Sequence, residues 1–329
     1  RHLTVNQPPV RRGGYSVMSK RNKNKIRIIG MNPQRFDKGQ LKFLGYLIPL
    51  ALVMMLPIVF IFFNAFKPTE ELFLYPPRFI TLRPTLQNFR NLVATSANKA
   101  IPASRYLFNS LLSTLLVMAL TLLITSSAAY VMSKKRYRLK NMLFELNKIS
   151  LMFVPVAVAI PRYFIITRLG LIDSFLSSVI PLLAMPVGLY LVKQFIDQIP
   201  ESMVEAARID GAGDYAILRR IIMPNITPAL ATVAVLSFQS AWNSTEASVY
   251  YMHNEAIKNF AYYLTSLSAG GNASDVTSAL TGGSAASGAL AGMGISAAGT
   301  LIMFVPNLVM FIFLQSKVMN TMAHSGMKS

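Results

Sequence analysis

The chain has 329 residues, of which 53% are hydrophobic and 14% are charged, and its mean hydropathy is +0.44. Soluble domains carry about 25% charged residues, so this composition argues against a soluble protein and indicates a membrane protein. The 32 Lys and Arg outnumber the 13 Asp and Glu, which together with the hydropathy favours anionic membrane lipid over nucleic acid as the partner. The absence of cysteine excludes disulfides and thiol catalysis, and the three histidines are too far apart for the usual metal motifs.

Residues 1–43 form a polar segment at the start of the chain, with eleven Lys and Arg and one acid, Asp37. The segment has no apolar run that would serve as a cleavable signal peptide. We therefore expect a cytoplasmic tail that is disordered and lies on anionic lipid. Met18 is a candidate start codon, which would place residues 1–17 upstream of the native start.

Six apolar segments follow within residues 44–314, and each is close to the roughly 20 helical residues that a bilayer core of about 30 Å requires. We therefore expect an all-α membrane protein with six transmembrane helices. Seven prolines lie inside these segments, where neighbouring helices can satisfy the carbonyl groups that a proline frees. The expected spans are Leu44–Phe66, Leu107–Met132, Lys148–Thr167, Phe175–Ile196, Ala229–Tyr251 and Ala297–Leu314.

The distribution of basic residues between the connections predicts the orientation. If the N-terminus lies inside, the inner segments hold 22 Lys and Arg and the outer segments hold 9. Both termini are therefore expected to be cytoplasmic, including a C-terminal tail over residues 315–329. The last outer connection, residues 269–299, is rich in Gly, Ala and Ser, and Gly288 and Gly292 are either a helix-packing face or chance glycines in a polar loop.

The inner connection between the fourth and fifth spans, residues 198–225, predicts a helix, a turn and a second helix. The glycines of Asp210-Gly211-Ala212-Gly213 permit a turn with positive φ. Asp214 is a candidate N-cap for the second helix, Tyr215–Met223, which Pro224 would end.

Small side chains and balanced charge distinguish this connection from the other inner segments. Ala206 and Ala207 leave a face on which another protein can approach the backbone closely. The stretch Lys193–Asn225 contains five acids and four bases, whereas the inner segments around it are strongly basic. This balance favours a protein partner over simple adhesion to lipid.

The spacing of residues in this connection resembles the EAA loop of permease subunits of binding-protein-dependent ABC importers. The matching residues are Glu205-Ala206-Ala207, Gly211 and Ile221-x-Met223-Pro224, with Met223 in place of the family's Leu. Further segments, spread over the chain after Leu44, are similar to the carbohydrate branch of that family. They are Pro84–Phe89, Asn109-Ser110, Val154-Pro155, Ile160-Pro161, Ile209–Ala212 and Ala241-Trp242-Asn243.

The resemblance implies a type I importer permease in a bacterial or archaeal cytoplasmic membrane. Such a subunit pairs with a homologous second permease subunit and two cytoplasmic ATPase subunits, and an extracytoplasmic solute-binding protein delivers the carbohydrate. The residues implied to dock the ATPase subunits are Glu205, Ala206, Ala207, Asp210, Gly211 and Pro224.

The sequence contains no G-x-x-x-x-G-K-[ST] motif that would cradle the phosphates of ATP. We therefore expect no enzyme activity and no cofactor in this chain. ATP and Mg²⁺ are expected in the partner ATPase subunits.

Four polar residues of the fifth span are predicted to share one helical face, namely Gln239, Asn243, Glu246 and Tyr250. A central acid that faces lipid costs about 2.5–3.5 kcal/mol, so this face is expected to line the substrate pathway or to contact the partner subunit. Trp242 and Tyr250 are the candidate aromatic surfaces for a sugar ring.

Three other functions remain open from the sequence. A permease for amino acids, peptides or phosphate would favour fixed countercharges, yet the spans are nearly free of central Lys and Arg, with Lys148 at an end. A secondary transporter or channel would favour intramembrane ionisable relays, for which only Glu246 is a plausible coupling acid. A membrane enzyme would need a nucleophile–base pair or a metal cluster, and neither is visible in the sequence.

Overall fold

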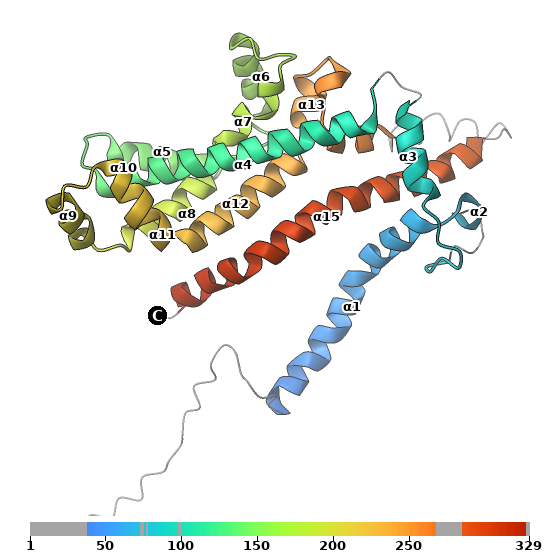
Figure 1. Cartoon of the computed structure of the whole chain (residues 1–329), viewed down its shortest axis with the longest axis horizontal. Helices are drawn as coiled ribbons and strands as arrows, with labels where there is room; N and C mark the ends of the chain where they lie inside the picture. The colour runs from blue at the N-terminus through green and yellow to red at the C-terminus, as the bar shows by residue number, and fades with distance from the viewer. Residues whose placement is uncertain (1–37, 73–75, 77, 98–100, 268–284, 327–329) are drawn as a thin grey trace, which may run out of the picture. The chain divides into compact units, whose positions relative to one another are not determined.

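The computed structural model describes residues 38–72, 76, 78–97, 101–267 and 285–326, and every regular element in these ranges is a helix (Figure 1). The chain divides into two compact units, Arg1–Met54 and Met55–Ser329. The first unit contains the beginning of α1 (Lys38–Phe66), and the second contains all the other described helices.

Three helices in the described residues are long and apolar enough to cross a membrane without a break. They are α1, α4 (Ala103–Lys134) and α15 (Ala285–Gly326), which contain the first, second and sixth predicted spans. Two bent pairs of helices raise the number of candidate spans to five. The predicted count of six is therefore not reproduced by uninterrupted helices.

The third predicted span, Lys148–Thr167, is wrong as a single helix. The chain forms α5 (Lys140–Ser150) and α6 (Ala159–Arg168), and irregular turns separate them. Pro155 explains the break, because it has no N–H to donate and disfavours the helical conformation of the residue before it. Pro161 lies in the first turn of α6, where a missing N–H is tolerated.

The fourth predicted span is present as a bent element. It comprises η1 (Phe175–Ser178), α7 (Ile180–Leu183) and α8 (Pro186–Asp197), and the two halves meet at 43°. The bend falls at Ala184 and Met185, directly before Pro186. A proline at this position begins a helix well but disfavours a helical residue before it, so the sequence itself places the bend.

The fifth predicted span, Ala229–Tyr251, is also divided. The structure has α12 (Thr227–Trp242) and the short α13 (Glu246–Tyr250), with a break at residues 243–245. The prediction of one continuous polar face along this span is therefore wrong beyond Trp242, because the 3.6-residue repeat is interrupted there.

The helix α15 extends well beyond the predicted sixth span, Ala297–Leu314. It begins within the Gly/Ala/Ser-rich stretch and continues to Gly326, so most of the predicted C-terminal tail is helical. The environment of Gly288 and Gly292 lies outside the described side chains, as do residues 269–284 of the same connection.

The helices of the second unit pack around α4, which contacts α8 and α12, and α12 in turn contacts α15 (Figure 1). One core joins these helices to the connection between α8 and α12. Its buried side chains are Ala129, Tyr130, Val192, Ile196, Ile199, Val204, Ile217, Ile222, Ile226, Ala229 and Val233. Because the connection contributes to this core, it is fixed to the bundle instead of hanging from it as a flexible loop.

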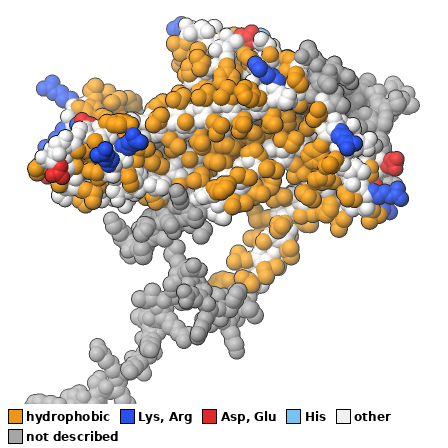
Figure 2. All heavy atoms as spheres, in the orientation of Figure 1, with side chains coloured by type: hydrophobic (Ala, Val, Ile, Leu, Met, Phe, Trp, Pro, Cys, Tyr) orange, Lys and Arg blue, Asp and Glu red, His pale blue; other side chains and the backbone are white. Residues whose placement is uncertain are grey.

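The surface of α4 is reversed relative to that of a helix in a soluble protein. Beside a few apolar residues such as Val117 and Ala129, its buried face carries Asn109, Ser110, Ser113, Thr114, Thr121, Thr125 and Ser126, whereas its exposed face carries Phe108, Leu111, Leu115, Leu120, Leu123 and Ile124. Over α4 and α12, Figure 2 shows a nearly continuous hydrophobic surface. Small polar residues inside and large apolar residues outside are typical of helices packed within a bilayer.

The Asn109-Ser110 pair attaches the segment after α13 to the beginning of α4. The Asn109 side chain donates to the carbonyl oxygens of Ala256 and Lys258 at 2.8 and 3.0 Å. The Ser110 hydroxyl accepts the N–H of Phe260 at 2.7 Å. Both polar side chains are buried, so these bonds give the pair a structural role that its sequence alone did not reveal.

Candidate functional site

The connection between α8 and α12 is a helical hairpin, as predicted. Its first helix is α9 (Glu201–Ile209), and its second arm comprises α10 (Asp214–Ile217), the π-turn η2 (Leu218–Ile222) and α11 (Met223–Asn225). Two details of the prediction are wrong. Asp214 is the first residue of α10 and makes no capping hydrogen bond, and Pro224 lies inside α11 instead of ending the preceding helix.

The turn of the hairpin depends on Gly211, which has a φ of +81°. Its N–H bonds to the carbonyl oxygen of Arg208 at 3.0 Å, and the N–H of Ala212 bonds to that of Ala207 at 2.9 Å. This pair of bonds is the Schellman motif, in which a residue with positive φ ends a helix. The two bonds satisfy carbonyl groups at the end of α9. Ala207 and Ala212 also pack against the common core, which fixes the direction in which the chain enters α10.

A set of polar contacts ties the hairpin to the end of α4. The Asp214 carboxylate accepts from the Lys135 ammonium at 2.7 Å and from the Tyr130 hydroxyl at 3.1 Å. The buried Lys134 ammonium donates to the carbonyl oxygen of Ile199 at 2.6 Å. The hydrogen bond from Lys135 lowers the pKa of Asp214 below its ordinary value. The hairpin is therefore fastened by charged groups as well as by its apolar core.

Replacing Asp214 by asparagine is expected to loosen α10 from α4. Because the pKa of Asp214 is lowered in the folded chain, its contribution is complete above the ordinary value of 3.8 and is lost as the pH falls through the lowered pKa. Hydrogen exchange of residues 201–223 in the purified subunit should therefore be faster in the variant at pH 7, and the difference should shrink as the pH falls through the lowered pKa of Asp214. Asp210→Asn is the control, since Asp210 is exposed and makes no side-chain bond among the described residues. Equal exchange in both variants would contradict the assignment.

The outward face of the hairpin is open. Glu205, Ala206, Asp210, Gly211 and Pro224 are exposed, as the predicted docking role requires, whereas Ala207 is half-buried against the core. Ile209 and Tyr215 lie on the two arms of the hairpin, although neither was among the residues implied to dock the ATPase subunits. Their side chains are 86% and 73% exposed on the two arms. The turn of the hairpin therefore carries apolar side chains in the open as well as polar ones.

The predicted pathway residues are distributed over two helices. Gln239 and Asn243 are exposed at the end of α12, whereas Glu246 and Tyr250 belong to α13. Trp242 does not present a surface to a ligand, which corrects its assignment. Its ring is 1% exposed and stacks on Phe238, and its indole N–H donates to the carbonyl oxygen of Met303 at 3.0 Å. The only tryptophan therefore joins α12 to α15.

Glu246 has a charged partner that could not be paired with it from the sequence. The Arg162 guanidinium on α6 donates from one nitrogen to both carboxylate oxygens of Glu246, at 2.9 and 2.8 Å. The Tyr251 hydroxyl donates to the same carboxylate at 2.7 Å. Arg162 lies near the end of the third predicted span, and in the structure it belongs to the short α6 after the break. The presence of an arginine in that predicted span was the only sign of this partner in the sequence.

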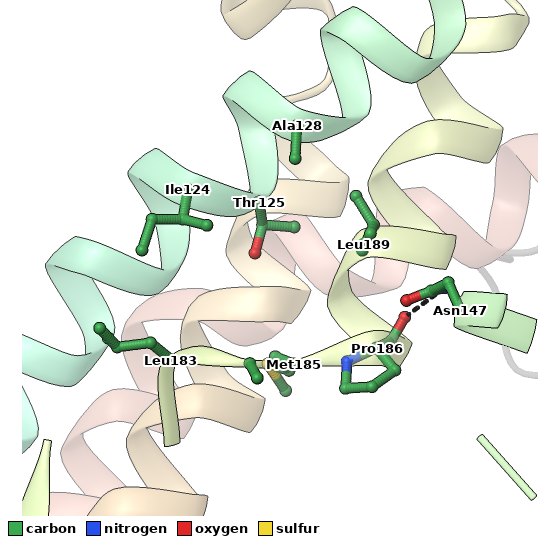
Figure 3. A pocket seen from close by; sticks show the side chains of 9 residues that line it. Ile124, Thr125, Ala128, Asn147, Leu183, Met185, Pro186 and Leu189 are labelled. Atoms are coloured by element: carbon green, nitrogen blue, oxygen red, sulfur yellow. Dashed lines mark hydrogen bonds between the residues drawn. The ribbon is translucent and has the colours of Figure 1, made fainter. Parts of the chain in front are cut away.

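A half-open cavity of about 180 Å³ lies at the bend between α7 and α8 (Figure 3). Its lining is mostly apolar and comes from α4, α5 and the bend. The side chain of Asn147 on α5 donates to the carbonyl oxygen of Pro186 at 3.2 Å and so holds the beginning of α8. The cavity therefore lies beneath the break between the two halves of this bent element. Among the described residues, no group of His, Asp and Glu side chains could hold a metal ion.

The comparisons with known proteins decide the family. Residues 126–316, more than half of the chain, match the model of the binding-protein-dependent transport system inner membrane component. The chain belongs to this family. It is therefore a transport subunit of a binding-protein-dependent system and an inner membrane component, and the resemblance found in the sequence is confirmed.

Individual members of the family are similar to the chain over most of their length. The sulfoquinovosyl glycerol transport system permease protein SmoH of Agrobacterium fabrum is 28% identical over 204 residues, 61% of this chain and 70% of that protein. The polygalacturonan/rhamnogalacturonan transport system permease protein YtcP of Bacillus subtilis is 27% identical over 214 residues, 64% of this chain and 72% of that protein.

A solved structure shows the same fold. It is that of a bacterial ABC transporter involved in the import of the acidic polysaccharide alginate, and one of its chains matches with a TM-score of 0.71. The match covers 87% of this chain and 99% of that chain at 20% identity. The predicted all-α fold of a type I importer permease is therefore confirmed for this family member.

Proposed function

We propose that this permease forms half of the translocation pathway for a carbohydrate in an ATP-driven importer. Relatives named for sulfoquinovosyl glycerol, polygalacturonan or rhamnogalacturonan, and arabinooligosaccharides support a carbohydrate substrate. The relative UgpE of Yersinia enterocolitica, 30% identical over 194 residues, is named for sn-glycerol-3-phosphate. A small polar solute of that kind is the second candidate.

The proposed complex contains a homologous second permease subunit, two cytoplasmic ATPase subunits and an extracytoplasmic binding protein. The hairpin and both chain termini lie on the cytoplasmic side in this arrangement. ATP and Mg²⁺ belong to the ATPase subunits, which dock on the hairpin at Glu205, Ala206, Ala207, Asp210, Gly211 and Pro224. Gln239, Asn243, Glu246 and Tyr250 line the passage of this subunit or its contact with the second permease.

One observation supports the role of the hairpin in coupling the ATPase subunits to the helical bundle. Its outward face is exposed, whereas its inward side chains Val204, Ile217 and Ile222 belong to the same core as α4, α8 and α12. A displacement applied to the exposed face is therefore transmitted to three helices of the bundle at once. Such rigid-body transmission is one way in which ATP-driven closure of a partner could reopen a pathway on the opposite side.

Replacing Ala206 by tryptophan tests the docking face. A bulky ring at this exposed position should hold an ATPase subunit away from the backbone of α9. We expect co-purification of the ATPase subunits and sugar uptake to fall at least tenfold, the loss that about 1.4 kcal/mol produces. Ala206→Ser is the matched control and should retain both. A tryptophan variant that binds the ATPase subunits and imports sugar at the wild-type rate would contradict the proposal.

The substrate class is tested separately in proteoliposomes that contain the wild-type complex and its binding protein. Uptake of radiolabelled oligosaccharides is compared with uptake of glycerol-3-phosphate and of amino acids. Import of an oligosaccharide supports the proposed substrate. If the complex imports glycerol-3-phosphate or an amino acid but no oligosaccharide, the proposed substrate is wrong. That result would not affect the docking role of the hairpin, which the Ala206 variants test.

A further inference from the structure

The segments α6 and α13 form a cluster that combines an ion pair with aromatic rings. They lie on the same side of α4 (Figure 1) and share a small core of Ile166, Ala247, Tyr251 and Met252. The N–H of Asp173, after α6, also bonds to the carbonyl oxygen of Tyr251 at 2.7 Å. The two segments are therefore positioned as one body, and the side chains at their surface have fixed neighbours.

One tyrosine contacts the ion pair of Arg162 and Glu246, and two further tyrosines lie next to that tyrosine. Tyr251 is buried, and its hydroxyl holds the Glu246 carboxylate. The rings of Tyr163 and Tyr250 lie 6.2 and 6.5 Å from the Tyr251 ring and are 40% and 58% exposed. The buried ring therefore anchors the acid, while two neighbouring rings present aromatic surface outward.

The ion pair retains unused hydrogen-bonding capacity. Both bonds of Arg162 to Glu246 leave from one guanidinium nitrogen. Within the described ranges, the other two nitrogens of Arg162 have no partner. One Glu246 oxygen accepts from Arg162 and Tyr251, whereas the other accepts from Arg162 alone and has room for a further donor. The side chains of both charged residues are more than a quarter exposed, so these sites are accessible.

We propose that Arg162 and Glu246, together with the rings of Tyr163 and Tyr250, form a contact site for a sugar ring on this subunit. One hydroxyl of the ring donates to Glu246, a neighbouring hydroxyl accepts from Arg162, and an apolar face of the ring packs on a tyrosine. The inference rests on the proposed carbohydrate function and adds a specific site to it.

The charges of Arg162 and Glu246 determine whether the site prefers a neutral or an acidic sugar. Arg162 and Glu246 neutralise each other, so the site offers strong donors and acceptors without net charge. An acidic sugar would gain an Arg162 contact but would also meet the Glu246 carboxylate close by, and like charges at this distance repel. The site therefore favours an uncharged ring, and Glu246 is the residue that determines this selectivity.

The test measures equilibrium binding of two radiolabelled sugars to the complete purified complex without its binding protein. The probes are a neutral hexose trisaccharide and trigalacturonic acid. The wild-type complex should bind the neutral sugar more tightly. Glu246→Gln should weaken binding of the neutral sugar about tenfold, because a charge-assisted hydrogen bond is lost, and should strengthen binding of the acidic sugar, because Arg162 is left unneutralised.

A second variant and a control keep the result interpretable. Tyr250→Ala leaves the ion pair intact and should weaken binding of both sugars. Glu145→Gln removes the exposed ion pair with Lys148 on α5 and should change neither affinity. Unchanged affinities in Glu246→Gln and Tyr250→Ala, with sugar import by the wild-type complex, would overturn this site alone. Absence of any sugar import by the wild-type complex would instead show that the proposed function itself is wrong.

Discussion

Replacing Gly211 by valine is expected to abolish transport while the chain still inserts into the membrane. The φ of +81° at this position lies in the left-handed region, which costs an ordinary L-residue about 1–2 kcal/mol and a β-branched residue more. We expect the variant to relieve this strain by breaking the turn, which would separate α9 from α10 and displace the face proposed to dock the ATPase subunits. Uptake by the complex and co-purification of the ATPase subunits measure the effect.

Gly213 provides a matched control two residues away. It lies in the same turn, but its φ of −71° and ψ of 162° are ordinary extended backbone that valine adopts readily. No atom lies within 4 Å of a β-carbon placed at either glycine, so the two variants differ in backbone strain and not in crowding within the chain. Gly213→Val should retain most of the uptake. Equal loss in both variants would mean that bulk at the docking face, and not the conformation of Gly211, is decisive.

Replacing Gly294 by alanine is expected to destabilise the second unit by roughly 2 kcal/mol or more. A β-carbon at Gly294 on α15 would lie 2.7 Å from the amide oxygen of Asn88. Asn88, on α3 (Gln87–Ala97), is fully buried, and its amide nitrogen donates to the carbonyl oxygens of Ala65 and Lys67 at 3.0 and 2.8 Å. The side chain cannot move away without leaving these carbonyl groups at the end of α1 unpaired. Thermal unfolding in detergent measures the loss.

Two further variants separate this clash from a general effect of alanine. Gly45→Ala, in a part of α1 where nothing lies within 4 Å of the added carbon, should be neutral or slightly stabilising. In an Asn88→Ala background, Gly294→Ala should cost much less than in the wild type, because the two sites share one contact. Additive losses would show that Asn88 is not the obstacle.

The helical hairpin and its turn were predictable from the sequence because their signals are local. Gly211 and Gly213 mark the turn, and the alanines of α9 mark an open face. The prolines also carry local information, and Pro155 and Pro186 each lie next to an observed break in a predicted span. A hydropathy average counts apolar residues over a window and does not register where a helix stops. The predicted spans were therefore drawn as continuous helices with kinks at these prolines.

The arrangement of the candidate pathway could not be predicted, because it depends on contacts distant in sequence. Arg162 and Glu246 are 84 residues apart, and neither shows in the sequence that the other is its partner. The indole ring of Trp242 made it a candidate for binding a sugar ring. Its N–H instead donates to the carbonyl oxygen of Met303, 61 residues later. A periodic pattern assigns a side chain to a face of its helix, whereas only the packing of other helices determines whether that face is open.

The π-turn before Pro224 has a geometric consequence for the hairpin. A proline in an α-helix clashes with the carbonyl group four residues earlier, here that of Arg220. In η2 the N–H of Met223 bonds instead to Leu218, five residues back, so the helix is locally wider where the proline follows. One extra residue in a turn rotates everything beyond it by about 100°. The wider turn before Pro224 thus sets the direction in which the outward face of the hairpin points, before the chain bends by 85° into α12.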